Sequence, residues 1–479
     1  MSSHPPSADV DSLSPQARHS ITGGILSLFV DSFDIYLPAF VLPAVMSYFE
    51  PPDMSDTMKV TVVTVIFVVT LLGRPIGGPL FGNLADRIGR KKVTMIAGGG
   101  FTVVTLLVAL MPGYGTWGYG SMVGLVALRL IGGIFLGGGY SGPVPLAIER
   151  SPQQLRGVVG GVIAAGAPAA VILISIIELL LLDRLPDDQL TSWGWRLPFL
   201  FGFLLGVAYM AYYVRVPEVD LEKLEATRDN DKAPLLQLFT KENRGDFVQV
   251  FLLMTGMWFA AQVVLSFLPG LMIGVLHQDA SNVSTLEIIA NLGTLVAMIG
   301  FGALGQRIGR RRLLLGMSAS VAIVATAAFL VLVILARSGA GFVPIAIVGF
   351  VALLLPNAPL GALVVYLNER FGAGVRSSGY GSAYTLSLIL PALYSVWING
   401  LAKVMPYEFA GVVLIALGGV LFFVGAWMGP ETRGTVLLGE PVAATPAPLP
   451  TLGSAHPTPT SPPRPRAAGE AWTTARSTD

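Results

Sequence analysis

Apolar residues in this chain gather in long, nearly unbroken runs that are separated by short polar segments. A helix needs about 20 apolar residues to cross a hydrocarbon core roughly 30 Å thick. By that measure the runs predict about twelve membrane-spanning helices. The predicted spans lie at 21–49, 59–83, 92–111, 119–147, 156–182 and 195–215, and then at 247–276, 284–305, 312–336, 341–368, 374–402 and 407–428. The pattern predicts an all-α polytopic membrane protein.

One polar hairpin in this pattern occurs twice. Between the second and third runs the chain reads Gly82-Asn-Leu-Ala-Asp86-Arg-Ile-Gly89-Arg90-Lys-Lys92. The segment from Gly302 to Arg312, 220 positions later (82 to 302), repeats it with Gly, Leu, Arg, Gly and Arg in register. A charged hairpin repeated at half-chain distance indicates two homologous six-helix bundles, an arrangement common in secondary transporters.

The polar segments divide the chain into five parts. We expect an N-terminal bundle at 19–215, a cytoplasmic linker at 216–246 and a C-terminal bundle at 247–430. Within the linker, 217–225 predicts a short charged helix. The ends, 1–18 and 431–479, are predicted to be disordered cytoplasmic segments, because they have too few large apolar residues to offset the entropy of ordering.

Composition excludes several classes of protein. The chain is 53% hydrophobic and only 12% charged, whereas soluble domains carry about 25% charged residues. A formal charge of +1 gives no indication of a nucleic-acid partner. The chain has no cysteine, and its four histidines form no metal-ligand pair, so we expect neither a metal site nor a cofactor.

The placement of Lys and Arg predicts the orientation in a plasma membrane. Cytoplasmic loops are rich in Lys and Arg. The cationic loops follow spans 2, 4, 8 and 10, which places both termini in the cytoplasm. The cations concerned are Arg87, Arg90, Lys91, Lys92, Arg150, Arg156, the 307–312 cluster, Arg370 and Arg376.

Ionisable residues inside spans are the candidates for transport chemistry, because they are costly in a membrane. In the first span Asp31 and Asp34 stand three residues apart on one helical face. A carboxylic acid in apolar surroundings can take up a proton near neutral pH, so both are candidate proton-coupling residues. Arg129, in the glycine-rich fourth span, is their expected partner. The alternative is a permanent structural ion pair.

Arg74 is the candidate substrate ligand. It stands 12 positions before Asp86 (86 − 74), about 18 Å along a helix, and a guanidinium can bind a carboxylate through two hydrogen bonds. It could equally be a fixed counter-ion for Asp31 or Asp34. Further candidates for substrate binding are aromatic and amide residues, namely Tyr36, Trp258, Gln262, Asn291, Tyr366, Asn368, Tyr380 and Tyr384. Ordinary packing also explains such residues.

The repeated hairpin is the predicted gate. Asp86 is expected to pair with a cation of a neighbouring helix end and so hold the two halves together. The other gating candidates are Gly82, Arg87, Gly89, Arg90, Glu149, Arg156 and Arg310. Gly166 with Pro168, and Pro356 with Pro359, predict kinks in spans 5 and 10.

The hairpin strongly resembles the loop signature of the major facilitator superfamily. The segments Arg74-Pro-Ile-Gly-Gly, Glu149-Arg-Ser-Pro-Gln-Gln-Leu-Arg156-Gly, Trp193-Gly-Trp-Arg-Leu-Pro-Phe, Arg215-Val-Pro-Glu218 and 369–380 extend the resemblance to its metabolite:proton symporter branch. The resemblance implies that Asp34 and Arg129 act in coupling and that Arg74 binds substrate. The chain departs from the branch at Asp31 and Phe33, where a Glu and a Tyr are usual, at Gln306 in the second hairpin, and in a missing proline near Phe371.

These observations predict a secondary active transporter rather than an enzyme. We expect alternating-access, proton-coupled uptake of a small organic acid or zwitterionic metabolite by a monomer in the lipid bilayer. A proton-driven exporter of drugs or metabolites with the same fold is the first alternative. A membrane-embedded enzyme or a receptor is the second, although the chain has no nucleotide loop, metal cluster or catalytic triad pattern. Sequence does not separate proton from sodium coupling.

Overall fold

The membrane helices lie close to the apolar runs that predict them. The computed structural model describes residues 14–437, except 52–53, 55 and 219–232, all within one compact unit, Met1–Glu440. Eleven helical segments of these residues are long and apolar enough to cross a membrane. The 33-residue helix α2 (Asp56–Ile88) is a further helix of spanning length. Every regular element in the described ranges is helical, which confirms the all-α polytopic class.

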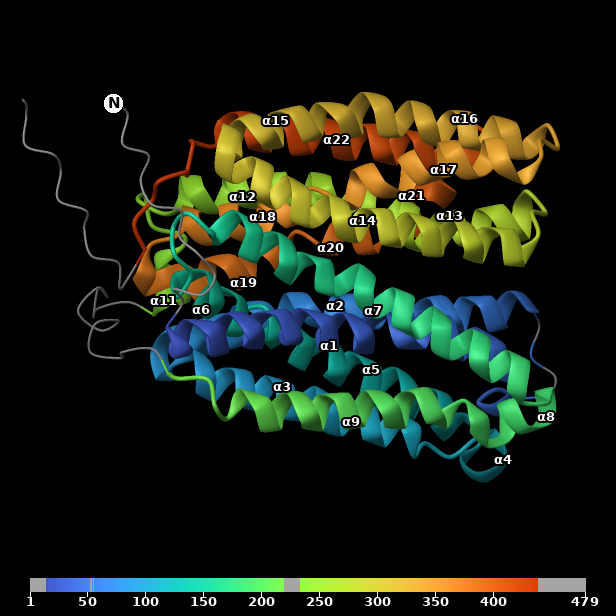
Figure 1. The fold of residues 1–479 in the computed structure, drawn as a ribbon. Coiled ribbons are helices and arrows are strands. Elements are labelled where there is room, and N and C mark those ends of the chain that lie inside the picture. The colour runs from blue at the N-terminus through green and yellow to red at the C-terminus, as the bar shows by residue number, and fades with distance from the viewer. Residues whose placement is uncertain (1–13, 52–53, 55, 219–232, 438–479) are drawn as a thin grey trace, which may run out of the picture. The chain divides into compact units, whose positions relative to one another are not determined.

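The helices of the first half are grouped in Figure 1 below those of the second half. The first half consists of α1 (Pro15–Val45), α2, α3 (Arg90–Ala109), α4 (Tyr114–Trp117), α5 (Tyr119–Gly139), α6 (Pro143–Glu149), α7 (Arg156–Arg184), α8 (Asp187–Gln189) and α9 (Arg196–Tyr213). The long helices pack as α2 on α5, α1 on α7, and α3 on both α5 and α9.

The second half repeats this arrangement with more interruptions. It consists of α11 (Pro234–Gln237), α12 (Arg244–Gln262), α13 (Leu268–Gly270), α14 (Ala280–Ile308), α15 (Arg310–Ser320), α16 (Thr326–Arg337), α17 (Phe342–Asn357), α18 (Leu360–Arg370), α19 (Arg376–Leu386), α20 (Ile389–Ala392), α21 (Tyr394–Leu401) and α22 (Ala410–Met428). π-turns at Val263–Phe267 and Val321–Ala325 continue α12 and α15 into the next helix.

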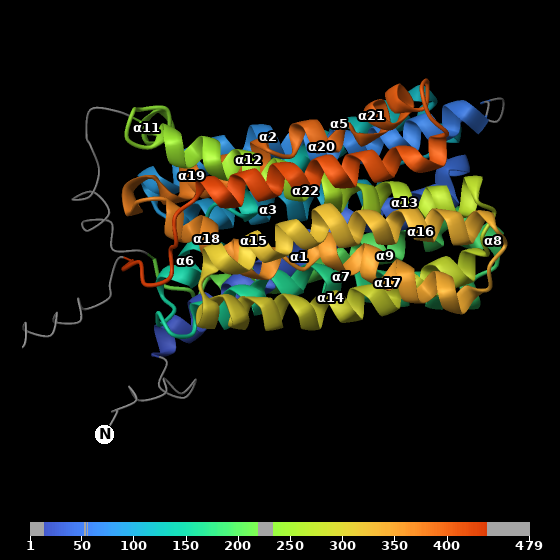
Figure 2. The same cartoon turned by 90° about the horizontal axis from the view of Figure 1, so that it is seen from above.

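The two halves meet along two helix pairs, α7 with α14 and α2 with α19. Figure 2 shows these helices from a second direction. Glycines permit the contact: a Cβ on Gly157 would lie 2.3 Å from the Gly302 carbonyl oxygen, and one on Gly82 would lie 2.8 Å from that of Ser377. Since small residues allow helix backbones to approach closely, the halves close tightly near the arginine-rich helix ends.

The prediction that both ends of the chain are disordered is wrong for part of each end. Helix α1 begins at Pro15, because the Ser14 side chain accepts a hydrogen bond from Ala17 N and caps the helix. At the other end, residues 431–437 are ordered against the second hairpin, and Thr432 and Leu437 are buried. The predicted linker, 216–246, contains α11 and the first turn of α12. Most of the charged helix predicted at 217–225 lies outside the described residues.

Helix breaks follow the prolines only in part. Span 10 breaks between α17 and α18, beside Pro356 and Pro359, which confirms that kink. Helix α7 instead runs through Pro168 without a break. Predicted span 11 is divided into α19, α20 and α21, with Pro391 inside the short middle helix. Predicted span 4 ends at Gly139 and resumes as α6.

Candidate functional site

A small cavity lies between the two halves, deeper along the helices than their tight contact. Its volume is about 50 Å³, which is room for roughly three to five water molecules. Five of the predicted substrate-binding residues line it, namely Tyr36, Arg74, Trp258, Asn291 and Tyr384. Four other candidates are buried but do not line the cavity, namely Gln262, Tyr366, Asn368 and Tyr380. The structure therefore brings most of the predicted substrate ligands into one place.

Arg74 enters this cavity from α2 with unused hydrogen-bonding capacity. The side chain is only 3% exposed, and its guanidinium lies 4.6 Å from the centroid of the Tyr140 ring. Its Nε and Nη2 atoms have no hydrogen-bond partner among the described residues. A buried donor without an acceptor costs about 1–3 kcal/mol, and more when it is charged. The cavity thus contains a guanidinium group with two nitrogen atoms available to donate hydrogen bonds to a bound acceptor.

Aromatic rings from both halves surround this cation. The Tyr140 ring of the first half stacks on Tyr384 of α19, with centroids 4.6 Å apart. The Trp258 ring meets Tyr384 edge-on at 5.3 Å, and Trp258 Nε1 donates a hydrogen bond to the Tyr384 carbonyl oxygen at 3.2 Å. Sequence reasoning missed Tyr140, although it directly follows the Gly137–Gly139 run, where the helix ends. The Tyr380 ring also stacks on Tyr384, with centroids 5.7 Å apart.

The predicted pairing of Asp34 with Arg129 has a specific geometry. Arg129 Nη1 lies 3.6 Å from Asp34 Oδ2, and Arg129 Nη2 donates to the Asp34 backbone carbonyl at 3.1 Å. The hydroxyl of Thr105 donates to Asp34 Oδ1, while Oδ2 has no hydrogen-bond partner in the described chain. Both side chains are almost fully buried. Asp34 therefore has one well-bonded oxygen and one that is only loosely paired.

Asp31 has a different neighbour, although it lies one turn away on the same helix. Arg74 is the cation that acts electrostatically on it. Neither of its carboxylate oxygens has a hydrogen bond of ordinary geometry among the described residues, although the Tyr140 side chain lies close enough to interact with it. The close approach of α5 requires glycine here, because a Cβ on Gly139 would lie 2.8 Å from Asp31 Oδ1. The two carboxylates thus belong to two separate charge groups, Asp31 with Arg74 and Asp34 with Arg129.

Asp86 joins the two halves through a helix N-terminus. It accepts hydrogen bonds from Ser377 N at 3.2 Å, from Ser378 N at 2.7 Å and from Ser378 Oγ at 2.8 Å. These groups begin α19, where backbone N–H groups have no helical partner and favour a negative charge. Arg90 also acts electrostatically on Asp86, but it belongs to the same half. Arg376 of the other half also interacts electrostatically with Asp86, so the helix N-terminus acts on this carboxylate in addition to a cation across the interface.

Glu149 is the second link between the halves. It binds Arg90 within its own half and Arg376 of the other half. Arg310 and Glu369 form the equivalent pair in the second half, with the same sequence separation of 59 residues. The sequence pattern places Arg376 only in a cationic loop, although its position is 220 residues after Arg156 (376 − 156). Arg87 is exposed and lies outside this network.

The hairpin glycines set the geometry of these links. Gly89 has φ of 102° and Gly309 has φ of 103°, a left-handed conformation that favours glycine. Each ends one helix of the hairpin and immediately precedes the next, so the arginine that follows, Arg90 or Arg310, begins a helix and points its side chain toward Glu149 or Glu369. The repeat in the sequence thus corresponds to a repeat in the ion-pair geometry.

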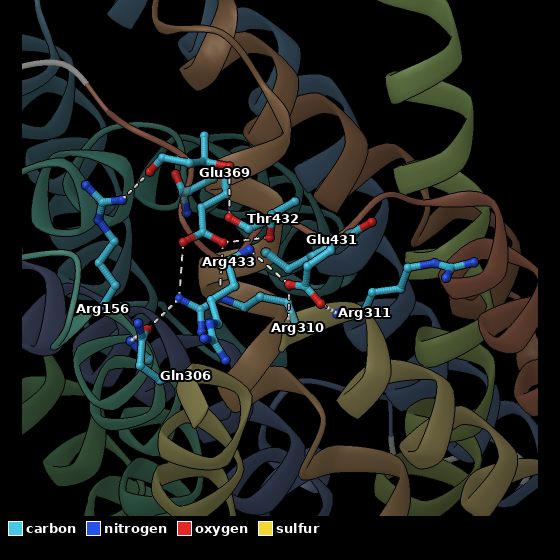
Figure 3. A network of polar contacts seen from close by, with 12 residues as sticks. Arg156, Gln306, Arg310, Arg311, Glu369, Glu431, Thr432 and Arg433 are labelled. Atoms are coloured by element: carbon cyan, nitrogen blue, oxygen red, sulfur yellow. Dashed lines mark hydrogen bonds and ion pairs between the residues drawn. The ribbon is translucent and has the colours of Figure 1, made fainter. Parts of the chain in front are cut away.

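The C-terminal segment 431–437 completes the network in the second half (Figure 3). Glu431 accepts hydrogen bonds from Arg310 N at 2.8 Å and from Arg311 N at 3.2 Å. Thr432 Oγ1 donates to Glu369 at 2.7 Å. Arg156 of the first half reaches across and donates to the Thr435 carbonyl at 2.7 Å. Arg156 therefore bonds to this segment, whereas its equivalent, Arg376, bonds to a glutamate.

We expect Asp86→Asn to lower transport about tenfold while membrane insertion stays normal. The change removes a charge that accepts three hydrogen bonds, each stronger than a neutral bond. The matched control is Gln306→Ala, at the equivalent position of the second hairpin, where Oε1 accepts from Gly157 N at 3.2 Å and from Arg310 at 2.8 Å. Initial rates in proteoliposomes, normalised to reconstituted protein, measure both. Equal losses from the two variants would contradict this role for Asp86.

Comparison with known proteins agrees with this architecture. The sequence profile of the Major Facilitator Superfamily matches residues 24–395. The inner membrane metabolite transport protein YhjE of Escherichia coli K12 is 28% identical over 83% of this chain and 92% of its own length. The shikimate transporter of the same organism is 26% identical over 85% of this chain and 94% of its own, and its proline/betaine transporter is 25% identical over 89% and 86%.

Solved structures show the same fold at low sequence identity. The proton:xylose symporter XylE bound to 6-bromo-6-deoxy-D-glucose superposes with a TM-score of 0.72 at 17% identity, over 88% of this chain and 97% of that chain. The human organic anion transporter MFSD10 gives 0.61 at 16% identity, over 86% and 100%. With twelve helical segments of spanning length among the described residues, arranged in two repeated halves, and a profile match over most of its length, the chain belongs to the Major Facilitator Superfamily and is a transporter, not an enzyme.

Proposed function

We propose that the protein takes up a small carboxylate-bearing metabolite, either an organic acid or a zwitterion, together with protons. The observation that carries this proposal is Arg74, which is buried at the cavity with two nitrogen atoms lacking hydrogen-bond partners. A carboxylate can satisfy both, because the planar guanidinium matches its two oxygens. The relatives named for shikimate and for proline/betaine transport support the same class of solute.

The other walls of the cavity restrict the size and character of the solute. A volume of about 50 Å³ favours a compact molecule over an extended one. The rings of Tyr140, Trp258 and Tyr384 offer aromatic surface beside the guanidinium, and aromatic faces attract ammonium groups as well as apolar ones. A zwitterion could place its carboxylate on Arg74 and its cationic end against the rings.

We propose coupling to protons because one carboxylate oxygen of Asp34 is only loosely paired with Arg129. Its Oδ2 atom lies 3.6 Å from Arg129 and accepts no hydrogen bond among the described residues. Pairing favours the ionised carboxylate, and separation from Arg129 in low-dielectric surroundings favours the protonated form. A change in the distance between α1 and α5 during transport would therefore bind or release a proton.

Alternating access is proposed to operate through the two links described above. In this conformation Asp86 and Glu149 close the arginine-rich ends of the helices. We place those ends, and both termini, in the cytoplasm, since Lys and Arg concentrate there. The conformation is then outward-facing or occluded, and uptake requires these links to separate. The protein is proposed to work as a monomer in the plasma membrane.

A ligand screen on purified protein tests the solute class. Small carboxylates, amino acids, betaines and sugars are added in turn while thermal unfolding is followed, since a ligand that binds only the folded state raises the apparent stability. We expect a carboxylate to give the largest shift and to be accumulated by proteoliposomes under an inward proton gradient. A neutral sugar as the best ligand would contradict the proposal. Net movement toward the proton source would identify an exporter instead.

A further inference from the structure

The arginine-rich end of the second half contains a hollow that the transport mechanism does not use. It has a volume of about 330 Å³ and is lined by Ile308, Gly309, Arg311, Arg312, Glu431 and Arg433. Figure 3 shows three of these residues, Arg311, Glu431 and Arg433. Three guanidinium groups and one carboxylate give it a net positive charge.

None of the three arginines forms an ion pair with a carboxylate of the described residues. Arg311 donates to the Trp427 carbonyl at 2.9 Å, and its Nε is buried without a hydrogen-bond partner. Arg433 donates to the Arg307 carbonyl. Glu431 is directed instead at backbone N–H groups, those of Arg310, Arg311 and Arg433. The hollow therefore retains positive charge that no carboxylate in the described chain neutralises through direct pairing.

An apolar groove continues from this hollow along the outside of the helices. Its volume is about 260 Å³. It shares Ile308 and Arg312 with the hollow, and its other lining residues are Phe301, Leu313, Gly316, Met317, Ser320 and Leu355. Gly316 is exposed, and a Cβ built there would meet no atom within 4 Å. The surrounding surface is apolar and faces outward, as Ile308 is 42% and Ile323 is 70% exposed. A charged hollow thus opens into a groove that faces the hydrocarbon core of the membrane.

The corresponding space in the first half is filled by side chains. The equivalents of Gly316 and Leu355, 220 residues earlier, are Ile96 and Phe135. The Phe135 ring packs on Phe81 with centroids 5.9 Å apart, and it lies 2.3 Å from where a Cβ of Gly100 would be. An aromatic ring therefore fills the space in the first half that remains open beside Leu355 in the second.

We propose that this site binds one anionic phospholipid, with its phosphate in the arginine hollow and an acyl chain in the groove. Charge complementarity supports the headgroup assignment, because basic pockets at the membrane surface bind anionic lipids and Arg binds phosphate oxygens in pairs. The largely apolar lining of the groove and the exposed apolar side chains beside it support the chain assignment. Inorganic phosphate would occupy the hollow but not the groove. Substitutions in the groove therefore distinguish a phospholipid from a free phosphate ion.

Native mass spectrometry of the full-length protein in detergent tests the site. The probes are dioleoyl phosphatidylglycerol, dioleoyl phosphatidylcholine and inorganic phosphate. The variants are Arg312→Gln in the hollow and Gly316→Ile in the groove. Their matched controls are Lys92→Gln, the equivalent cation of the first half, and Gly300→Ile, an exposed helical glycine outside the groove that also has no atom within 4 Å of a Cβ.

We expect phosphatidylglycerol to bind more tightly than phosphatidylcholine, and each variant to weaken its binding about fivefold or more. The two controls should change it less than twofold. Inorganic phosphate should respond to Arg312→Gln and not to Gly316→Ile. The proposal is overturned if Gly316→Ile leaves phosphatidylglycerol binding unchanged, which would indicate an anion site without a lipid chain. It is also overturned if phosphatidylcholine binds as tightly as phosphatidylglycerol.

Discussion

Accumulation of substrate against its gradient is expected to vanish in Asp34→Asn. Asparagine imitates the protonated aspartic acid and cannot release a proton, so a step that depends on deprotonation is lost. The loss should be specific, because Thr105 and Arg129 hold Asp34 at positions that an amide can also occupy. Uptake into proteoliposomes with an imposed pH gradient measures it.

Exchange of external for internal substrate provides the control for Asp34. Exchange needs no net proton movement, so it should survive in Asp34→Asn at a rate within a few-fold of the native protein. Asp31→Asn is the matched variant, because Asp31 belongs to the Arg74 group instead, and its main expected effect is on substrate affinity. If Asp34→Asn still concentrates substrate with a normal pH dependence, the proton site lies elsewhere, and Asp31 is the next candidate.

Arg74→Lys is expected to raise the half-saturation concentration on the order of tenfold to hundredfold. Lysine retains the charge but loses the planar pair of donors that a carboxylate needs. A hydrogen bond to a charged group contributes about 1.5–3 kcal/mol, which sets the expected range. Initial rates of uptake over a series of substrate concentrations give the value.

Arg196→Lys serves as the control for Arg74. Arg196 is another arginine over aromatic rings, since its guanidinium lies 4.9 Å from the Tyr48 ring and 4.5 Å from that of Trp195, but it does not line the cavity. Its substitution should leave the half-saturation concentration unchanged. Unaltered affinity in Arg74→Lys would exclude a two-donor contact between Arg74 and the substrate.

The fold could be predicted from the sequence because its main signals are local. Apolar runs of spanning length and the repeated hairpin depend on neighbouring residues, and they led to the right class, the right family and spans close to the observed helices. Helix ends were less certain, because they depend on single caps such as Ser14. The divided span 11 was missed because the apolar run continues through Pro391, although the helix does not.

The partners of individual side chains required the structure. The Asp34–Arg129 proximity could be expected from two charges in apolar spans, since each needs compensation. The contacts of Thr432 and Thr435 could not, because a stretch of Thr, Gly and Arg after the last span has the composition of a disordered tail. Tyr140 was missed for a related reason: its role depends on Tyr384, which lies 244 residues later (384 − 140) in the other half.

The inequality between the two hairpins affects how the protein opens. On one side the α2–α19 contact is held by the charge of Asp86, and on the other the α7–α14 contact is held by the neutral amide of Gln306. A neutral hydrogen bond contributes about 1 kcal/mol, and one to a charged group contributes about twice that. We therefore expect the α7–α14 contact to separate first and the α2–α19 contact, which the charge of Asp86 holds, to separate second. The two halves would then move apart unevenly, beginning at the edge formed by α7 and α14.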